Sequence, residues 1–393
     1  MSVTKILLKP GKEQSIKRFH PWVFSGAIQK VEGQAHNGDI VDVLDSKGLY
    51  LGTGHAAEGS IAVRLFSFTG YDDPANFWLS KIQSAFDLRK RLGFISNNET
   101  NIYRLVNAEG DGLPGLIVDV YGKTAVIQTH SVGMYEQRQT IADSIMKVYG
   151  GEILSVYDRG DGKAGTANGD AKGAYLIGMK QDSVCLEHGC KFSVDWEEGQ
   201  KTGFFIDQRE NRKLLGDYSA GKKVLNTFCY TGGFSIYALK SGAILAHSLD
   251  SSQKALDLAV QNATLNGFDS ASHDVIKADA VEYMKSLRED YDVIVLDPPA
   301  FAKHLSARHK AVQGYIRINE AAIRQIKPGG IIFTFSCSQA IDKKLFRDSL
   351  LAASINAGRK VRILHQLHQP ADHPISIYHP EGEYLKGFVI EVD

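Results

Sequence analysis

The sequence predicts an α/β protein of several domains, with a parallel β-sheet in its C-terminal half. Its length of 393 residues is about two to three times that of a usual domain. Short strands broken by glycines fill the N-terminal part, and a regular alternation of strands and helices begins near residue 190. We therefore expect a β-barrel or sandwich in residues 1–73, a small α+β domain in residues 74–190 and an α/β domain in residues 191–393.

The composition is that of a globular protein and excludes a long disordered tail or a low-complexity chain. Hydrophobic residues make up 43% of the chain and charged residues 23%, which is the ordinary mix of globular domains. Lys and Arg (45) equal Asp and Glu (45), so a nucleic-acid partner would have to be held by a local basic patch. The four cysteines are typical of reduced thiols in a cytoplasmic protein. Neither a membrane span nor a secretion signal is expected, because no apolar run approaches ~18 residues and the first residues contain no cleavage-like site.

The predicted N-terminal domain combines short strands with a basic and aromatic segment. Strands are expected in residues 5–8, 40–44, 49–53 and 61–66, with glycines between them. Basic side chains beside aromatic ones could serve RNA phosphates and stacked bases. A solvated basic loop with the tryptophan in the core explains the same residues equally well. The candidate RNA contacts are Lys9, Lys12, Arg18 and Trp22.

The predicted central domain mixes helices and strands. An amphipathic helix begins at Pro74 and ends in a basic cluster, and a second helix is expected in residues 134–148. Strands are expected in residues 102–106, 115–120, 125–129 and 153–158. Residues 160–173, rich in Gly, Asp, Lys and Ala, indicate an exposed flexible loop. Cys185 and Cys190 flank a histidine, but no second pair completes a tetrahedral zinc site, so we expect a hairpin and no metal.

The C-terminal domain is predicted to bind a nucleoside cofactor at one edge of its sheet. Successive strands are expected in residues 224–226, 246–249, 275–278, 293–296 and 331–335, and open α/β sheets bind ligands at the carboxyl ends of their strands. The turn after the first strand lacks the G-x-G-x-x-G spacing of dinucleotide sites.

Acidic residues end the next two strands, where Asp250 could bond ribose hydroxyls and Asp279 could meet an adenine. A turn with few glycines followed by these acids suits S-adenosylmethionine, whose sulfonium has no phosphate to cradle. Each acid alone could equally cap the following helix. The candidate cofactor residues are Asn226, Cys229, Tyr230, Thr231, Asp250, Ser251, Asp279, Ala280 and Asp297.

The fourth and fifth strands end in the candidate catalytic residues. Asp297 leaves a hydrophobic strand into Pro298 and Pro299, which restrict the backbone and so aim the carboxylate rigidly. Cys337 ends the fifth strand, where a lone cysteine is most often a packing residue. At this edge, however, a thiolate could add to C6 of cytosine and make C5 nucleophilic, while a carboxyl group at N3 stabilises the adduct.

At this point the chain resembles the ribosomal RNA large subunit methyltransferase I family, which makes 5-methylcytosine in 23S ribosomal RNA. The resemblance runs nearly end to end and rests on residues 20–26, 111–115, 201–209, 230–234, 297–299, 335–338 and 371–374. It implies an N-terminal PUA domain, a central α+β domain and a C-terminal Rossmann-like class I methyltransferase domain. It also implies that Cys337 is the nucleophile, that Asp297 contacts the cytosine and that Gln208 and Arg209 line the cofactor cleft.

The chain departs from the pattern of many RNA cytosine-C5 methyltransferases at one position, and two other functions remain possible from the sequence. Ala300 stands where many RNA cytosine-C5 methyltransferases carry a second cysteine, so the base that removes the C5 proton is not identified. The first alternative is a guanine-N2 methyltransferase of ribosomal RNA, and the second is a noncatalytic ribosome-assembly factor. The expected partner is 23S ribosomal RNA or a precursor of the large subunit, and a homodimer is one oligomeric state that the sequence leaves open.

Overall fold

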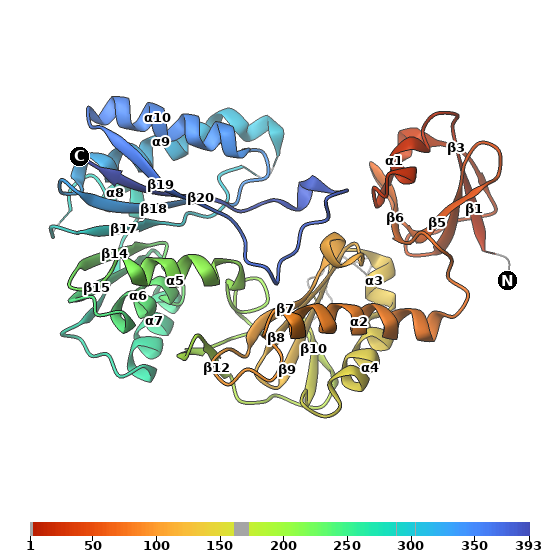
Figure 1. The fold of residues 1–393 in the computed structure, drawn as a ribbon, viewed down its shortest axis with the longest axis horizontal. Helices are drawn as coiled ribbons and strands as arrows, with labels where there is room; N and C mark the ends of the chain where they lie inside the picture. Colours follow the sequence, from red (N-terminus) through yellow and green to blue (C-terminus); the bar gives the residue numbers. More distant parts are fainter. Residues whose placement is uncertain (1–2, 161–172, 288, 303) are drawn as a thin grey trace. The chain divides into compact units, whose positions relative to one another are not determined.

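A computed structural model describes residues 3–160, 173–287, 289–302 and 304–393 (Figure 1). The predicted loop of residues 160–173 lies almost wholly outside them. The chain divides into two compact units. Unit 1 comprises Met1–Cys185, Val194–Phe204 and Ala371–Gly382, and unit 2 comprises Leu186–Ser193, Phe205–Pro370 and Glu383–Asp393. Within the described residues, no helix combines the length and apolar character needed to cross a membrane.

The N-terminal part of unit 1 is a six-stranded sheet of order β2-β6-β5-β4-β1-β3. Its core forms because side chains alternate between two faces of each strand, as in β4, where Val41 and Val43 are buried between more exposed neighbours. Two strands, β2 and β3, were not expected from the sequence. The elements are β1 (Thr4–Leu8), α1 (Gln14–Lys17), β2 (Trp22–Phe24), η1 (Ser25–Ala27), β3 (Ile28–Glu32), β4 (Ile40–Leu44), β5 (Tyr50–Ala56) and β6 (Ile61–Ser67).

The second part of unit 1 is a five-stranded sheet of order β11-β10-β9-β8-β7 that packs with helices. Asp73 caps the first of these, α2, by accepting a hydrogen bond from the Asn76 amide, and α2 buries Trp78 and Ile82 at helical spacing. The predicted helix of residues 134–148 is divided in two at Gln137. The elements are α2 (Pro74–Arg91), β7 (Ile102–Asn107), η2 (Ala108–Asp111), β8 (Leu116–Tyr121), β9 (Thr124–Thr129), α3 (Val132–Glu136), α4 (Arg138–Tyr149), β10 (Ser155–Asp158) and β11 (Ala174–Ile177).

Unit 2 contains a seven-stranded sheet of order β16-β15-β14-β17-β18-β20-β19, in which the first five are parallel and β20 runs antiparallel to β18. Figure 1 shows α9 and α10 on one face of this sheet and α6 and α7 on the other. The strands are β14 (Lys223–Thr227), β15 (Leu245–Asp250), β16 (His273–Lys277), β17 (Val293–Leu296), β18 (Gly330–Ser336), β19 (Val361–Leu367) and β20 (Lys386–Val392). The helices are η3 (Ile206–Gln208), α5 (Arg209–Asp217), α6 (Gly233–Lys240), α7 (Gln253–Leu265), α8 (Ala280–Tyr283), η4 (Leu305–Ala307), α9 (Arg308–Gln325) and α10 (Lys343–Ala357).

The central strand β17 is buried along its whole length, as expected for a parallel strand covered on both faces. Its register pairs Leu296 with Thr227 of β14 and with Thr334 of β18. The carboxyl ends of these three neighbouring strands therefore meet at one edge of the sheet. A separate hairpin, β12 (Val184–Glu187) and β13 (Cys190–Ser193), occupies the place where the sequence predicted one.

Candidate active site

The loop after β14 has an unusual backbone for residues that are not glycine. Phe228 (φ 54°) and Tyr230 (φ 47°) both lie in the left-handed region, where a residue with a β-carbon is strained by about 1–3 kcal/mol. The loop is held in place by hydrogen bonds from the Cys229 amide to the Leu249 carbonyl (3.0 Å) and from the Tyr230 amide to Asp250 Oδ2 (3.1 Å). Such strain at a strand end indicates a loop shaped for a ligand.

The two predicted acids both cap local structure. Asp250 accepts hydrogen bonds from the Tyr230 amide and, through Oδ1, from the Ser252 amide (2.9 Å). Asp279 accepts one from the Glu282 amide at the start of α8 (3.0 Å). Capping uses one oxygen of the exposed Asp279 carboxylate, so the other oxygen can accept from a bound ligand. The capping role and a ligand role are therefore compatible.

Asn226 gives the best test of whether a ligand fits this edge. Its side chain is 1% exposed at the end of β14, and its Nδ2 donates to Ser235 Oγ (3.0 Å). Its Oδ1 is buried without a hydrogen-bond partner among the described residues. Because a buried unpaired oxygen is unfavourable, Asn226 is suited to accept from a donor that the cofactor supplies, such as an ammonium or amino group.

The other predicted cofactor residues surround this loop at different depths. Thr231 is buried, and its carbonyl accepts from Asn262 Nδ2 (2.9 Å). Burial raises the pKa of the Cys229 thiol far above its ordinary value, so Cys229 stays protonated and serves packing. Ala280 is buried at the start of α8, whereas Ser251 is exposed after β15.

Asp297 is aimed by a hydrogen-bonded chain of buried amides. Gln208 donates from Nε2 to Asp297 Oδ2 (3.0 Å) and accepts from Asn211 Nδ2 (2.6 Å). Gln208 and Asn211 are both nearly inaccessible to solvent, so their amides can hold a single orientation. Gln208 is thus hydrogen-bonded directly to the candidate catalytic carboxylate. Arg209, its neighbour, is fully buried and donates to Glu210 Oε1 (3.2 Å).

Cys337 follows the last residue of β18 and is the one partly exposed cysteine among four, all of which lie in the described residues. The serines on either side of Cys337 fix this segment of the chain through hydrogen bonds of their side chains. Ser336 and Ser338 each form a hydrogen bond with the Tyr315 hydroxyl (2.9 Å), and Ser338 Oγ also accepts from the Ala302 amide (3.3 Å). Since Ala302 belongs to the loop that follows Asp297, the two candidate catalytic segments are tied together.

Sequence reasoning missed one charged residue in this region, Lys386. The register of β18 and β20 pairs it with Ser336, and its Nζ donates to the Ser338 carbonyl (2.9 Å). The residue is only 4% exposed. Burial lowers the pKa of Lys386, and the charge of Cys337 opposes that shift. A lysine opening an apolar run could have been noticed in the sequence, but nothing there indicates that this run pairs with the strand ending at Cys337.

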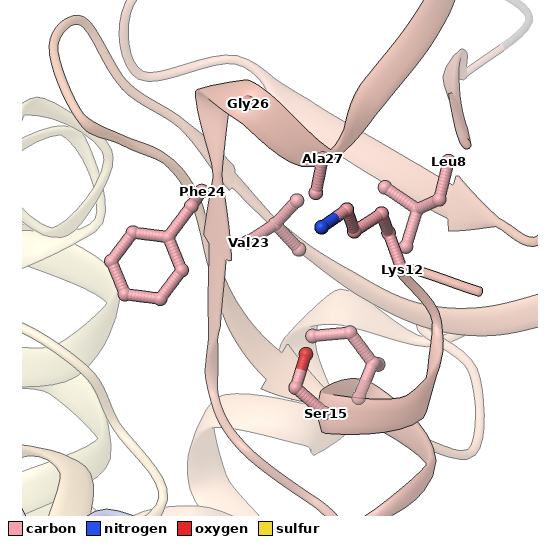
Figure 2. A pocket seen from close by; sticks show the side chains of 8 residues that line it. Leu8, Lys12, Ser15, Val23, Phe24, Gly26 and Ala27 are labelled. Atoms are coloured by element: carbon pink, nitrogen blue, oxygen red, sulfur yellow. The ribbon is translucent and has the colours of Figure 1, made fainter. Parts of the chain in front are cut away.

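One of the candidate RNA-binding residues, Lys12, lines a hollow of about 310 Å³ in unit 1 (Figure 2). Figure 2 shows the Lys12 side chain reaching across it toward Val23 and Ala27. Lys12 and Arg18 are exposed, and their side chains have no hydrogen bond or ion pair with the described residues. Lys9 is different, because its Nζ donates to the Gly26 carbonyl (3.0 Å).

Trp22 lies apart from this hollow and is held by contacts within unit 1. Its indole Nε1 donates to Glu109 Oε1 (2.9 Å), and its ring lies 4.3 Å from the ring of His379, measured between centroids. The indole is thus partly buried and hydrogen-bonded within unit 1, and its contact with RNA stays a prediction. Within the described residues, no group of three or more His, Cys, Asp or Glu side chains is arranged to hold a metal.

Two family models match the chain. A PUA-like domain matches residues 6–68, and an S-adenosylmethionine-dependent methyltransferase matches residues 168–378. Among curated proteins, Ribosomal RNA large subunit methyltransferase I of Alteromonas mediterranea is 38% identical over 99% of this chain and 98% of its own length. The protein of that name from Aeromonas hydrophila is 39% identical over 99% of each chain.

Solved structures share the fold over the whole length. A proposed S-adenosylmethionine-dependent methyltransferase from Streptococcus mutans matches with a TM-score of 0.84 at 23% identity, covering 99% of this chain and 100% of its own. A proposed methyltransferase complexed with SAH matches with a TM-score of 0.85 at 24% identity and the same coverage. The predicted fold class and the predicted S-adenosylmethionine dependence are confirmed.

Proposed function

The chain belongs to the ribosomal RNA large subunit methyltransferase I family of S-adenosylmethionine-dependent enzymes, and from this premise we propose that it methylates C5 of a cytosine in 23S ribosomal RNA through a covalent bond to Cys337. One observation carries the proposal. The only partly exposed cysteine of the chain follows the strand beside the one that ends in Asp297, at the edge predicted to hold the cofactor. An enzyme that methylates an amino group needs no such thiol. We propose that it acts in the cytoplasm, where it would meet its ribosomal RNA substrate.

Each candidate residue then has a defined task. S-adenosylmethionine, when bound, supplies an electrophilic methyl group on its sulfonium. The Cys337 thiolate forms a bond to C6 of the cytosine, and the π electrons of the C5–C6 bond move toward N3, where the carboxyl group of Asp297 stabilises them. C5 would take the methyl group with the electron pair that returns from N3, and the electrons of the broken methyl–sulfur bond would stay on the cofactor's sulfur. A base that is not identified among the described residues would then take the C5 proton. The electrons of that C–H bond restore the double bond, and the thiolate of Cys337 leaves.

The remaining candidate residues bind the cofactor or orient the Asp297 carboxylate. Gln208 and Asn211 keep the Asp297 carboxylate in place, so it needs no rearrangement when the base arrives. Asn226, with the loop of residues 228–232, is proposed to hold the amino acid part of the cofactor, and Asp250 and Asp279 are proposed to hold its ribose and adenine. Because the reacting carbon is hidden in stacked RNA, the cytosine has to be turned out of the stack to reach Cys337.

RNA contacts are proposed on one surface in each unit. In unit 1 the surface is the hollow crossed by Lys12. In unit 2 it is a groove of about 760 Å³ between α8 and α9 that includes Phe301, four residues after Asp297. Lys310 and Arg317 line this groove, and both are exposed and unpaired within the described residues. Their charges suit the phosphates of the strand beside the target base.

The double variant Lys12→Ala/Arg18→Ala is expected to weaken RNA binding and its dependence on salt. Each lost phosphate contact should reduce the slope of log K against log salt concentration by about 0.7 for single-stranded RNA, so the double variant should lose about 1.4. Filter binding of unmodified 23S RNA over a salt series measures this slope. Lys344→Ala on α10 is the control, because that lysine is exposed and paired with Asp348 (2.8 Å). An unchanged slope in the double variant would remove this surface from the RNA interface.

The reaction itself is tested by identifying the methylated nucleoside. The protein is incubated with labelled S-adenosylmethionine and 23S RNA lacking the modification, and the RNA is digested to nucleosides. We expect all label in 5-methylcytidine. Label in N2-methylguanosine would support the guanine-N2 alternative, and no label together with no cofactor binding by calorimetry would support a noncatalytic assembly factor.

A further inference from the structure

Lys386 is a buried cation without a carboxylate partner. The residue is 4% exposed, and no Asp or Glu of the described residues lies within ion-pair distance of its ammonium group. Burying an ammonium away from water is unfavourable unless an opposite charge or several hydrogen bonds compensate it. The single hydrogen bond from Nζ to the Ser338 carbonyl (2.9 Å) is incomplete compensation for three N–H donors. The protein therefore keeps a costly charge at this place.

The charge lies against the segment that carries the proposed nucleophile. Lys386 opens β20 opposite Ser336, the residue before Cys337, and its Nζ bonds the residue after it. Among the charges that act on the ammonium, Cys337 comes before Glu383 and Asp342. Tyr315, on α9, is another titratable group that interacts with Cys337. Burial raises the pKa of its phenol, so Tyr315 stays neutral, whereas Lys386 brings a positive charge to this segment.

We propose that Lys386 is a positioning residue that stabilises Cys337 as a thiolate, ready to add to C6 of the cytosine. This inference rests on the proposed function. A cysteine ordinarily has a pKa of about 8.5, so only a few per cent is nucleophilic at neutral pH. A cation within about 4–6 Å favours the charged form and lowers that pKa by roughly one to three pH units. The hydrogen bond to the Ser338 carbonyl holds the ammonium against the backbone that carries Cys337, and β20 supplies it from a paired strand.

The test compares three variants by the rate at which Cys337 reacts with iodoacetamide between pH 5 and pH 10. Cys185, Cys190 and Cys229 are buried, so mass spectrometry of the peptide that contains Cys337 follows the accessible thiol. Lys386→Met removes the charge, and Lys386→Gln removes the charge but keeps a donor for the Ser338 carbonyl. Lys344→Gln removes a distant exposed charge. Thermal unfolding establishes that each variant is folded.

We expect the pH midpoint of alkylation to rise by about one to three units in both Lys386 variants and to stay unchanged in Lys344→Gln. The acidic limb of the pH profile of kcat should move in the same direction. A Lys386→Gln variant with the wild-type midpoint would overturn the proposal, because Lys386 would then only anchor Ser338. The alkylation uses neither RNA nor cofactor, so it can succeed or fail independently of which nucleoside carries the methyl group.

Discussion

Cys337→Ala is expected to reduce methyl transfer to 23S RNA by at least about 10³-fold, because without the thiolate C5 of cytosine is too weak a nucleophile to take the methyl group. Transfer of tritiated methyl groups in single-turnover reactions measures the loss. The affinity for S-adenosylmethionine, measured by calorimetry, should be unchanged, since Cys337 acts on the base. Full activity in Cys337→Ala would contradict the covalent mechanism and favour the guanine-N2 alternative.

A matched variant and a trapping experiment sharpen this result. Cys190→Ala removes a fully buried thiol from β13, away from the proposed chemistry, and should keep the transfer rate at some loss of stability. RNA that contains 5-fluorocytosine cannot lose a proton from C5, so the adduct should accumulate. A protein–RNA band that resists denaturation is expected with the wild type and Cys190→Ala, and not with Cys337→Ala.

The position of a candidate residue could be predicted from sequence where it depends on the end of that residue's own strand. Asp250 ends β15, while Asp297 and Cys337 directly follow β17 and β18, and parallel strands bring their carboxyl ends to one edge. The same argument reached Asp279, which caps α8 from the end of β16. In each case the information is local, because the run, the turn and the polar residue are neighbours in the chain.

Features that depend on distant pairing could not be predicted in this way. The last strand in sequence, β20, inserts between β18 and β19, and only that order brings Lys386 beside Ser336. The bond from Gln208 to Asp297 joins residues 89 positions apart. The indole of Trp22 bonds Glu109, 87 positions away, which no local pattern around Trp22 reveals. These contacts follow from how elements pack, and packing is set by many residues together.

Asp297→Asn is expected to lower kcat by about 10²- to 10⁴-fold, the usual contribution of a positioned acid or base. The substitution keeps the shape of the side chain, and the amide oxygen can still accept the hydrogen bond from Gln208 Nε2. What it removes is the ability to carry or share a proton at N3 of the cytosine. The loss should therefore fall on kcat, with little change in KM for RNA. Steady-state kinetics with labelled cofactor measure both quantities.

Asp292→Asn is the matched control, because Asp292 precedes the first residue of the same strand, at the opposite edge of the sheet. Its pKa is held below the ordinary value by Lys327 and by the Lys223 amide, which act against the effect of burial. Losing that carboxylate should lower stability and leave kcat nearly as in the wild type.

Calorimetry with S-adenosylmethionine separates the two roles predicted for Asp297, which are contact with the cofactor and stabilisation of the cytosine. An Asp297→Asn variant that loses cofactor affinity while keeping kcat at saturating cofactor would assign the carboxylate to the cofactor and remove it from the chemistry of the base.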